Sequence, residues 1–321
     1  MTIEHIGISG AGLMGRGIAS TLLGFGFRVS VYSPGGEAEL SSAIKQIEQD
    51  LKDMVACGLC SSDVVASWRD RYEASDSLDI LAKSDFVIEA VIEDIHVKQS
   101  IYNRIEDIVG PSVTISSNSS AIPATVVQQG RQRPGRFVSM HWGEPAHNRF
   151  MEIIPGAQTD PRCVAEAAEI ARRCKKDPSL LKKDIRGFIT NRLMYSVFRE
   201  AIHLLESGVA DVEMIDRSFQ NDVGSYSTIA GPFRLMDITG IAVYATVMKD
   251  LLPELSTYTQ VPETMKRLVD EGANGIYNGR GFYDYTPEES EVWKRKWEEF
   301  GFDIRELADK YLPLDNSDES S

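Results

Sequence analysis

Two histidines and two glutamates stand within twelve positions near the middle of the chain, in the segment HWGEPAHNRFMEIIPG at residues 141–156. A histidine beside a carboxylate can act as a general base, because the carboxylate fixes the imidazole tautomer and stabilises the imidazolium that forms. The same residue types can also hold a metal ion or lie in an ordinary buried strand. The segment alone does not decide which histidine pairs with which glutamate.

The spacing of His141, Glu144 and His147 does not favour a metal site. A proline interrupts the segment, so these side chains cannot share one helix face as the two histidines of an HExxH motif do. Cys57 and Cys60 stand without a second ligand pair nearby and are interpreted as thiols at the end of a helix. We therefore expect no metal.

A glycine-rich turn, GAGLMG at residues 10–15, lies between a strand-like run (3–9) and a helical stretch that reaches residue 23. In that context Gly10 allows the tight turn, Gly12 lets the backbone approach a pyrophosphate, and Gly15 lets the helix pack against the strand. Leu13 and Met14 open the helix, whose N-terminus faces the phosphates. The pattern predicts a dinucleotide site, and a tight connection without a ligand is the alternative.

The second expected strand, residues 28–32, is followed by Ser33, where such units usually place an Asp or Glu for the ribose hydroxyls. A neutral hydroxyl removes the usual repulsion against a 2′-phosphate. However, the next basic residue is Lys45, and Glu37 and Glu39 lie close to Ser33 in the sequence. We expect NAD as the cofactor, with NADP as the open alternative.

Strand-like and helix-like segments alternate through the first half of the chain. Further strands are expected within residues 84–94, 112–123, 135–142 and 150–156, and helices within 96–109 and 161–174. This alternation predicts an α/β fold, a Rossmann-like, doubly wound and mostly parallel sheet with its site at the carboxyl ends of the strands. Glu93, the SNSS turn at 117–120 and His141 should then lie near one edge of the sheet.

The pattern becomes all-helical from about residue 186. One helix carries apolar residues on two faces, which predicts burial on two sides, including against a partner. These residues are Ile189, Leu193 and Val197 on one face, and Tyr195, Phe198 and Ile202 on the other. We predict an NAD-binding domain at 1–185, a helical substrate and dimerisation domain at 186–312 that forms a homodimer, and a disordered acidic tail at 313–321.

The composition limits the partners. The chain has 321 residues, a net charge of -14 and four cysteines. Nucleic acid and anionic membrane surfaces are poor partners, because both require clustered Lys and Arg. No apolar run is long enough for a membrane span and no secretory signal opens the sequence, so we expect a cytoplasmic protein.

Several motifs, in order along most of the chain, resemble those of the 3-hydroxyacyl-CoA dehydrogenase family. They are GAGLMGRGIA at 10–19, VIEAVIEDIHVK at 87–98, SNSS at 117–120, His141 with MEIIPG at 151–156, GFITNRL at 187–193, AGPFRLMDITG at 230–240 and GRGFYDY at 279–285. The resemblance implies a Rossmann-like domain followed by a helical dimerising domain. It also implies NAD-dependent oxidation of the secondary alcohol of a 3-hydroxyacyl-CoA or a related 3-hydroxy compound.

The resemblance assigns roles to individual residues. It implies that His141 is the catalytic base, that Glu152 orients it, and that Ser120 and Asn191 donate or accept hydrogen bonds around the reacting hydroxyl or carbonyl. Each of these residues also has a purely structural interpretation. His141 could be a strand-end histidine that bonds the backbone, Ser120 could cap a helix and Asn191 could make a structural hydrogen bond. The resemblance also assigns Glu93 and Lys98 to the nicotinamide-side ribose, although the two could equally form a solvated ion pair.

The sequence departs from the family pattern in ways that bear on the substrate. Glu144 stands where the family commonly has Asn, and Arg186 stands where it has Pro beside Gly. The helical arm at 37–63 has only Lys45 and Lys52 among six acidic residues, which disfavours CoA phosphates. A small hydroxy acid or hydroxylated amine without CoA is therefore one alternative, and a non-catalytic dinucleotide-binding or structural protein is another.

Overall fold

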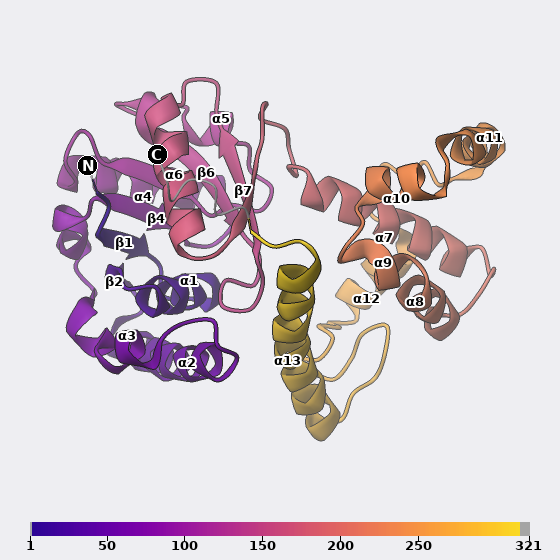
Figure 1. Cartoon of the computed structure of the whole chain (residues 1–321), viewed down its shortest axis with the longest axis horizontal. Coiled ribbons are helices and arrows are strands. Elements are labelled where there is room, and N and C mark those ends of the chain that lie inside the picture. Colours follow the sequence, from indigo (N-terminus) through magenta and orange to yellow (C-terminus); the bar gives the residue numbers. More distant parts are fainter. Residues whose placement is uncertain (1, 315–321) are drawn as a thin grey trace. The chain divides into compact units, whose positions relative to one another are not determined.

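The computed structural model describes residues 2–314, and the chain divides into two compact units between Asn191 and Arg192. The first unit contains every strand of the sheet and the second is helical (Figure 1). The strands are β1 (His5–Ser9), β2 (Arg28–Tyr32), β3 (Tyr72–Ser75), β4 (Phe86–Glu89), β5 (Thr114–Ser117), β6 (Phe137–Trp142), β7 (Phe150–Pro155) and β8 (Asp177–Leu180).

The helices of the first unit connect these strands. They are α1 (Leu13–Gly24), α2 (Gly36–Ala56), α3 (Ser62–Ala66), α4 (Ile95–Ile108), α5 (Ala124–Val127) and α6 (Pro161–Arg173), with 3-10 turns at Trp68–Arg71, Leu78–Lys83 and Pro134–Arg136. Local caps define several starts. Asp94 accepts hydrogen bonds from the amides of His96 and Val97 at the start of α4, and Asp160 caps α6, where Pro161 occupies the first helical position.

The eight strands form one sheet in the order β3-β2-β1-β4-β5-β6-β7-β8. Every neighbouring pair is parallel except β6 and β7, which are antiparallel. The first six strands follow the doubly wound dinucleotide-binding order, in which the strand order reverses between the parallel neighbours β1 and β4. The predicted Rossmann-like, mostly parallel fold is confirmed. Strands β3 (YEAS) and β8 (DPSL) were not expected, because neither contains an apolar run.

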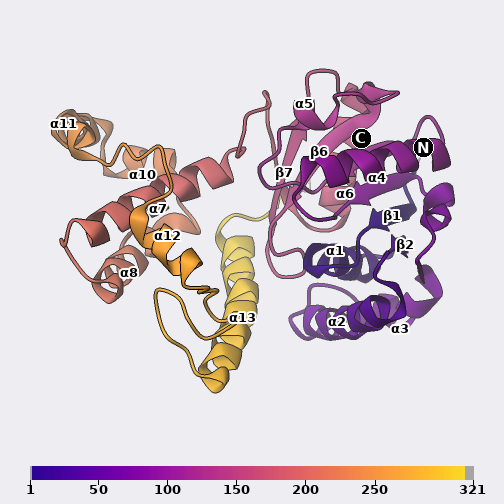
Figure 2. The same cartoon turned by 180° about the vertical axis from the view of Figure 1, so that it is seen from behind.

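Helices cover both faces of the sheet. Ile115 of β5 packs in one buried cluster with Ile101 and Ile105 of α4, whereas the hydroxyl of neighbouring Thr114 contacts Cys163 of α6. Because adjacent strand residues point to opposite faces, α4 and α6 lie on opposite sides. Figure 1 looks onto the α6 side and Figure 2 onto the α4 side. This burial on both faces explains the continuous apolar runs of the central strands.

The second unit consists of helices joined by turns. They are α7 (Thr190–Glu206, which begins at the end of the first unit), α8 (Val212–Asn221), α9 (Val223–Ser227), α10 (Pro232–Thr239), α11 (Ile241–Leu251), α12 (Glu263–Asp270) and α13 (Pro287–Tyr311), with a 3-10 turn at Leu252–Glu254. Thr286 and Glu289 form a reciprocal capping box at the start of α13. The predicted helical character of this part of the chain is confirmed.

The single chain buries α7 on neither side, and the burial that was expected against a partner stays a prediction. Helices α7 to α12 contain no buried residue among those that the structure describes. Leu193 is 55% exposed and Tyr195 is 64% exposed, so both apolar faces of α7 remain open to solvent. An apolar stripe indicates that a face will be covered, but its pattern does not say whether the same chain provides the cover.

Across residues 2–314, no helix combines the length and the apolar character that crossing a membrane would require. The predicted disordered tail at 313–321 lies, from residue 315 onwards, outside the described residues.

Candidate active site

His141 and Glu152 face each other across the antiparallel pair β6 and β7. The strand register pairs the two residues directly, and His141 Nδ1 lies 2.9 Å from Glu152 Oε2. Both side chains are buried. Since directly opposed residues project to the same side of a sheet, the register makes the contact a consequence of the fold. The His–Glu pair of the opening segment is therefore His141 with Glu152.

The contact assigns the tautomer of His141. A carboxylate only accepts hydrogen bonds, so Nδ1 carries the proton and donates it to Glu152, which leaves the lone pair of Nε2 available. Nε2 has no hydrogen-bond partner among residues 2–314. The rings of Phe150 and Phe188 flank the imidazole with centroid distances of 5.3 and 5.5 Å. A neutral imidazole held this way can accept a proton from a hydroxyl.

The second oxygen of Glu152 is held by the start of α7. Oε1 accepts hydrogen bonds from the amides of Ile189 (3.0 Å) and Thr190 (2.9 Å) and from the Thr190 hydroxyl (3.3 Å). A positive φ at Phe188 turns the chain just before these amides. Burial opposes the charge of Glu152, but the hydrogen bonds from His141 and these amides outweigh it and lower the pKa of the carboxyl group. Glu152 is therefore held as a carboxylate.

Ser120 and Asn191, the two other residues assigned to the site, contact each other within the first unit. Asn191 Nδ2 donates to the carbonyl oxygen of Ser120 at 2.5 Å. Glu93 Oε1 accepts from the amides of Ser120 (3.1 Å) and Ala121 (3.2 Å) and from the Ser119 hydroxyl. The Ser120 backbone is thus held from two sides. The Ser119 hydroxyl accepts hydrogen bonds from the amides of Ala121 and Ile122, and Pro123 precedes α5, so the Ser120 side chain is not the helix cap considered above.

Lys98 belongs to a buried network and is not part of a solvated ion pair. Its Nζ lies 2.7 Å from Glu89 Oε1 and 3.3 Å from Glu93 Oε2, and its side chain is 1% exposed. Glu89, at the end of β4, also accepts hydrogen bonds from the hydroxyls of Tyr102 and Ser117. Burial, reinforced by the Glu89 charge, raises the pKa of Tyr102 well above its ordinary value. The buried charges of Lys98 and Glu89 are therefore paired with each other, as burial of charged groups requires.

Two glycines make the strand-to-helix turn after β1 possible. Gly10 has φ +119°, and a Cβ there would lie 2.6 Å from the carbonyl oxygen of Ala90. A Cβ at Gly15 would overlap the carbonyl oxygen of Gly10. Backbone atoms therefore leave no room for a side chain at Gly10 or at Gly15.

The ligand side of the same turn is open. A Cβ at Gly12 would meet nothing within 4 Å, and Leu13, the next residue, is 66% exposed. Leu13 and Met14 begin α1, whose N-terminus has no side-chain cap and no acidic residue in its first turn. These amides and the space above Gly12 fit a pyrophosphate, since a helix N-terminus favours negative charge.

This difference between Gly12 and Gly15 leads to a prediction. Gly12→Ala should leave the melting temperature within about 2 °C of the wild type, because a surface change without a steric conflict costs little. It should still weaken NADH binding about tenfold or more, since the Cβ fills the phosphate space. Gly15→Ala should instead lower the melting temperature by several degrees. Thermal unfolding and NADH titration of both variants check this, and equal behaviour of the two would contradict it.

The other residues of the opening segment are held differently. Glu144 is exposed, and its backbone carbonyl accepts hydrogen bonds from the amides of His147 and Asn148. Buried Lys176 donates to the carbonyl oxygens of Pro145 (2.6 Å) and Asn148 (2.5 Å), and so fixes the turn that follows His141. No group of three metal-ligand side chains gathers anywhere in the described part of the chain.

Cys57 and Cys60 lie at and just beyond the C-terminal end of α2. Burial, together with the neighbouring Cys57 sulfur, raises the pKa of Cys60 to about 11. A raised pKa keeps the thiol protonated, whereas redox and metal chemistry need the thiolate. The position agrees with the interpretation of these residues as helix-end thiols.

Sequence reasoning missed three residues that shape the site: Glu89, Thr190 and Lys176. Glu89 could have been found, because a carboxylate inside the apolar run FVIEAVIED requires a partner when it is buried. Thr190 lies inside the recognised GFITNRL motif but gives no signal of its own. Lys176 follows α6 in a polar segment, and only its burial against the turn after His141 reveals its contribution.

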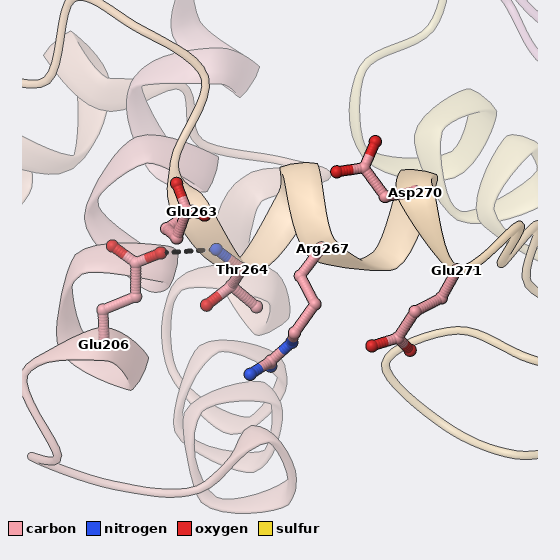
Figure 3. A pocket seen from close by; sticks show the side chains of 6 residues that line it. All are labelled: Glu206, Glu263, Thr264, Arg267, Asp270 and Glu271. Carbon is pink, nitrogen blue, oxygen red and sulfur yellow. Dashed lines mark hydrogen bonds between the residues drawn. The ribbon is translucent and has the colours of Figure 1, made fainter.

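One hollow among the described residues lies in the second unit, along α12. Its volume is about 670 Å³, and it is lined by Glu206, Glu263, Thr264, Arg267, Asp270 and Glu271 (Figure 3). The Glu206 carboxylate accepts a hydrogen bond of 2.8 Å from the Thr264 amide, which caps the start of α12. The lining contains no base and orienter pair, so this hollow is not the candidate active site.

The sheet order and the glycine turn define the first unit as a dinucleotide-binding domain of the kind found in dehydrogenases. Comparison with protein families agrees. Residues 5–185 match the model described as 3-hydroxyacyl-CoA dehydrogenase, NAD binding domain, and residues 187–285 match the C-terminal domain of the same enzymes. The chain belongs to the 3-hydroxyacyl-CoA dehydrogenase family, and it is an NAD-dependent oxidoreductase.

Two curated relatives illustrate the range of the family. The chain is 32% identical, over 90% of its length and 93% of the relative's, to a 5-formyl-3-hydroxy-2-methylpyridine 4-carboxylate 5-dehydrogenase of Mesorhizobium japonicum. It is 30% identical, over 90% of its length and 100% of the relative's, to a probable 3-hydroxybutyryl-CoA dehydrogenase of Bacillus subtilis.

Solved structures show the same two groups. A 5-formyl-3-hydroxy-2-methylpyridine 4-carboxylic acid 5-dehydrogenase, described as an NAD+ dependent dismutase, matches with a TM-score of 0.90 and 30% identity, covering 95% of this chain and 98% of that one. An (S)-3-hydroxybutyryl-CoA dehydrogenase from Ralstonia eutropha matches with a TM-score of 0.73 and 30% identity, covering 89% and 100%.

Proposed function

We propose that this chain transfers a hydride between NAD and the carbon of a secondary alcohol or ketone, with His141 as the acid or base. The observation that carries the proposal is the contact between His141 Nδ1 and Glu152 Oε2, which leaves Nε2 without a partner among the described residues. Oxidation of an alcohol removes a hydride and a proton, and His141 is suited to accept the proton. NAD, when bound, accepts the hydride.

The other proposed residues prepare the site. Glu152 orients the imidazole of His141 and stabilises the imidazolium that forms. Ser120, whose hydroxyl makes no hydrogen bond with the described residues, is proposed to hydrogen-bond the reacting oxygen. Asn191 positions the Ser120 loop through its contact with the Ser120 carbonyl. In the reverse direction His141 returns the proton to the developing alkoxide.

Cofactor binding is proposed for Gly10, Gly12, Leu13, Met14 and Gly15 on the phosphate side. Glu93 and Lys98 are proposed for the nicotinamide-side ribose. The support for Glu93 is its exposed location beside Ser120, since its Oε1 already accepts the loop amides. Lys98 is buried, so its proposed contribution is to hold Glu93 in place. Ser33 is also buried, and its hydroxyl donates to Glu39.

The first candidate substrate is a 3-hydroxyacyl-CoA or a related 3-hydroxy compound, as in the 3-hydroxybutyryl-CoA dehydrogenases. The second is a small compound without CoA, as the name of the pyridine-compound dehydrogenase indicates for that relative. A charge observation favours the second candidate. Glu48 on α2 pairs with Lys52 at 3.2 Å and with Arg69 at 2.9 Å, so its carboxylate offsets one of these two positive charges.

A reductase assay tests the function. Loss of NADH absorbance would be followed with acetoacetyl-CoA, free 3-keto acids and small amino ketones. Turnover of the thioester supports the first substrate class, and turnover of the free compounds alone supports the second. If no member of either class reacts while NADH binds, the proposed dehydrogenase activity on these compounds is wrong and the non-catalytic alternative gains support.

We also propose that the second unit forms a homodimer. Its support is the row of exposed apolar side chains, including Phe233 at 79% and Tyr195 at 64%, on helices without buried residues. Patches of this kind mark interaction surfaces. Light scattering should give a mass near twice the 35.7 kDa of one chain at micromolar concentration. A monomer mass over the whole concentration range would contradict the dimer.

The domain division at 1–185 and 186–312 and the cytoplasmic location remain proposals as well. The family matches at 5–185 and 187–285 support the division. Four free cysteines support a reducing compartment, since disulfides form in oxidising ones.

A further inference from the structure

The carboxylate of Glu39, in the first turn of α2, lies at the end of β2. Ser33 follows the last residue of β2, and its hydroxyl donates a hydrogen bond to Oε2 of Glu39, in the first turn of α2. Ser33 is fully buried and Glu39 is half-buried. A buried serine thus fixes the direction in which the glutamate points.

This carboxylate lies beside the dinucleotide turn. The amide of Gly10 donates to the carbonyl oxygen of Tyr32 at 2.8 Å, so the end of β2 is joined directly to the glycine turn. In doubly wound domains an acidic side chain at this end of β2 binds the ribose hydroxyls of NAD. Glu39 Oε1 has no hydrogen-bond partner among residues 2–314, so it can accept from such a hydroxyl.

Gly35 makes room for the arrangement. A Cβ at Gly35 would overlap Glu39 Oε2, although the backbone of Gly35, with φ -73°, suits any residue. The glycine is therefore required by the position of the carboxylate and not by the backbone conformation. Among residues 2–314, Glu39 is the acidic residue whose side chain bonds Ser33, and neighbouring Glu37 is exposed.

We propose that Glu39, held by Ser33, binds the adenosine ribose of NAD and excludes NADP. The inference rests on the dinucleotide site of the proposed function and adds the residue that selects the cofactor. The end of β2 has Ser33 in place of the usual acidic residue, and Glu39 in the first turn of α2 supplies the carboxylate instead. Its negative charge would repel a 2′-phosphate, and its free oxygen accepts the 2′-hydroxyl.

Equilibrium binding of NADH and NADPH, by fluorescence or calorimetric titration, tests the proposal without turnover. The wild type should bind NADH more tightly than NADPH. Glu39→Gln should lower this preference by about tenfold or more, since a charged hydrogen bond and a repulsion are both lost. Glu37→Gln removes the same charge from the same helix turn and should change the preference less than about twofold.

Gly35→Ala provides a second variant that keeps the charge of Glu39. Its Cβ should displace the carboxylate and weaken NADH binding as Glu39→Gln does, with an unchanged melting temperature. The proposal is overturned if the wild type prefers NADPH, if Glu39→Gln keeps the preference, or if both glutamine variants change it equally. Tight NADH binding without turnover would instead contradict the dehydrogenase activity and leave the role of Glu39 standing.

Discussion

His141→Ala should lower turnover by about a hundredfold to ten-thousandfold, the range in which a general acid or base contributes. The dissociation constant of NADH should change less than about twofold, because His141 contacts Glu152 and two aromatic rings and no part of the glycine turn. Steady-state rates with the substrate identified in the reductase assay, together with NADH titration, measure both effects.

His147→Ala is the matched control for this experiment. It removes the other histidine of the opening segment, which the site does not use, and should keep the rate within about fivefold of the wild type. If His141→Ala kept its rate and His147→Ala lost it, the wrong histidine would have been assigned. If neither variant changed an observed rate, proton transfer by a histidine of this segment would be excluded.

Glu152→Gln should lower kcat by a similar factor through a different cause. The amide oxygen can still accept from the Ile189 and Thr190 amides, but the amide nitrogen donates to His141 Nδ1. The proton of the imidazole then lies on Nε2, so the nitrogen that should accept the proton becomes a donor. In a serine protease the corresponding carboxylate-to-amide change lowers kcat about ten-thousandfold for this reason.

NADH affinity and the melting temperature distinguish this tautomer effect from unfolding. Both should stay near the wild-type values in Glu152→Gln, whereas Glu152→Ala leaves two partly buried amides without an acceptor and should also lower the melting temperature. Glu73→Gln, an exposed change on edge strand β3, is the control. Equal kcat values for Glu152→Gln and the wild type would show that Glu152 does not orient the base.

Local sequence patterns were sufficient to predict the fold class and the central strands. The glycine turn was recognisable because its glycine spacing and the strand-like and helical runs on either side all lie within about twenty neighbouring residues. The central strands were recognisable because strands buried on both faces are continuously apolar. Strands β3 and β8 were not recognisable from the sequence. A short polar segment becomes a strand only when an edge of the sheet offers it hydrogen bonds.

The candidate site depended more on the tertiary structure. Family resemblance selected His141 and Glu152, but spacing alone left two histidines and two glutamates open. The antiparallel register of β6 and β7 sets the contact, because a shift by one residue would turn Glu152 to the other face.

By itself, then, the sequence determined the strand and helix order, the glycine turn and the family, because these depend on residues close together in the chain. Only the tertiary structure decided that Lys98 is held by Glu89, that Glu39 lies beside Ser33 and that α7 stays exposed within one chain. Each of these depends on which side chains meet once the helices and strands have packed, and periodicity along one segment does not contain that information.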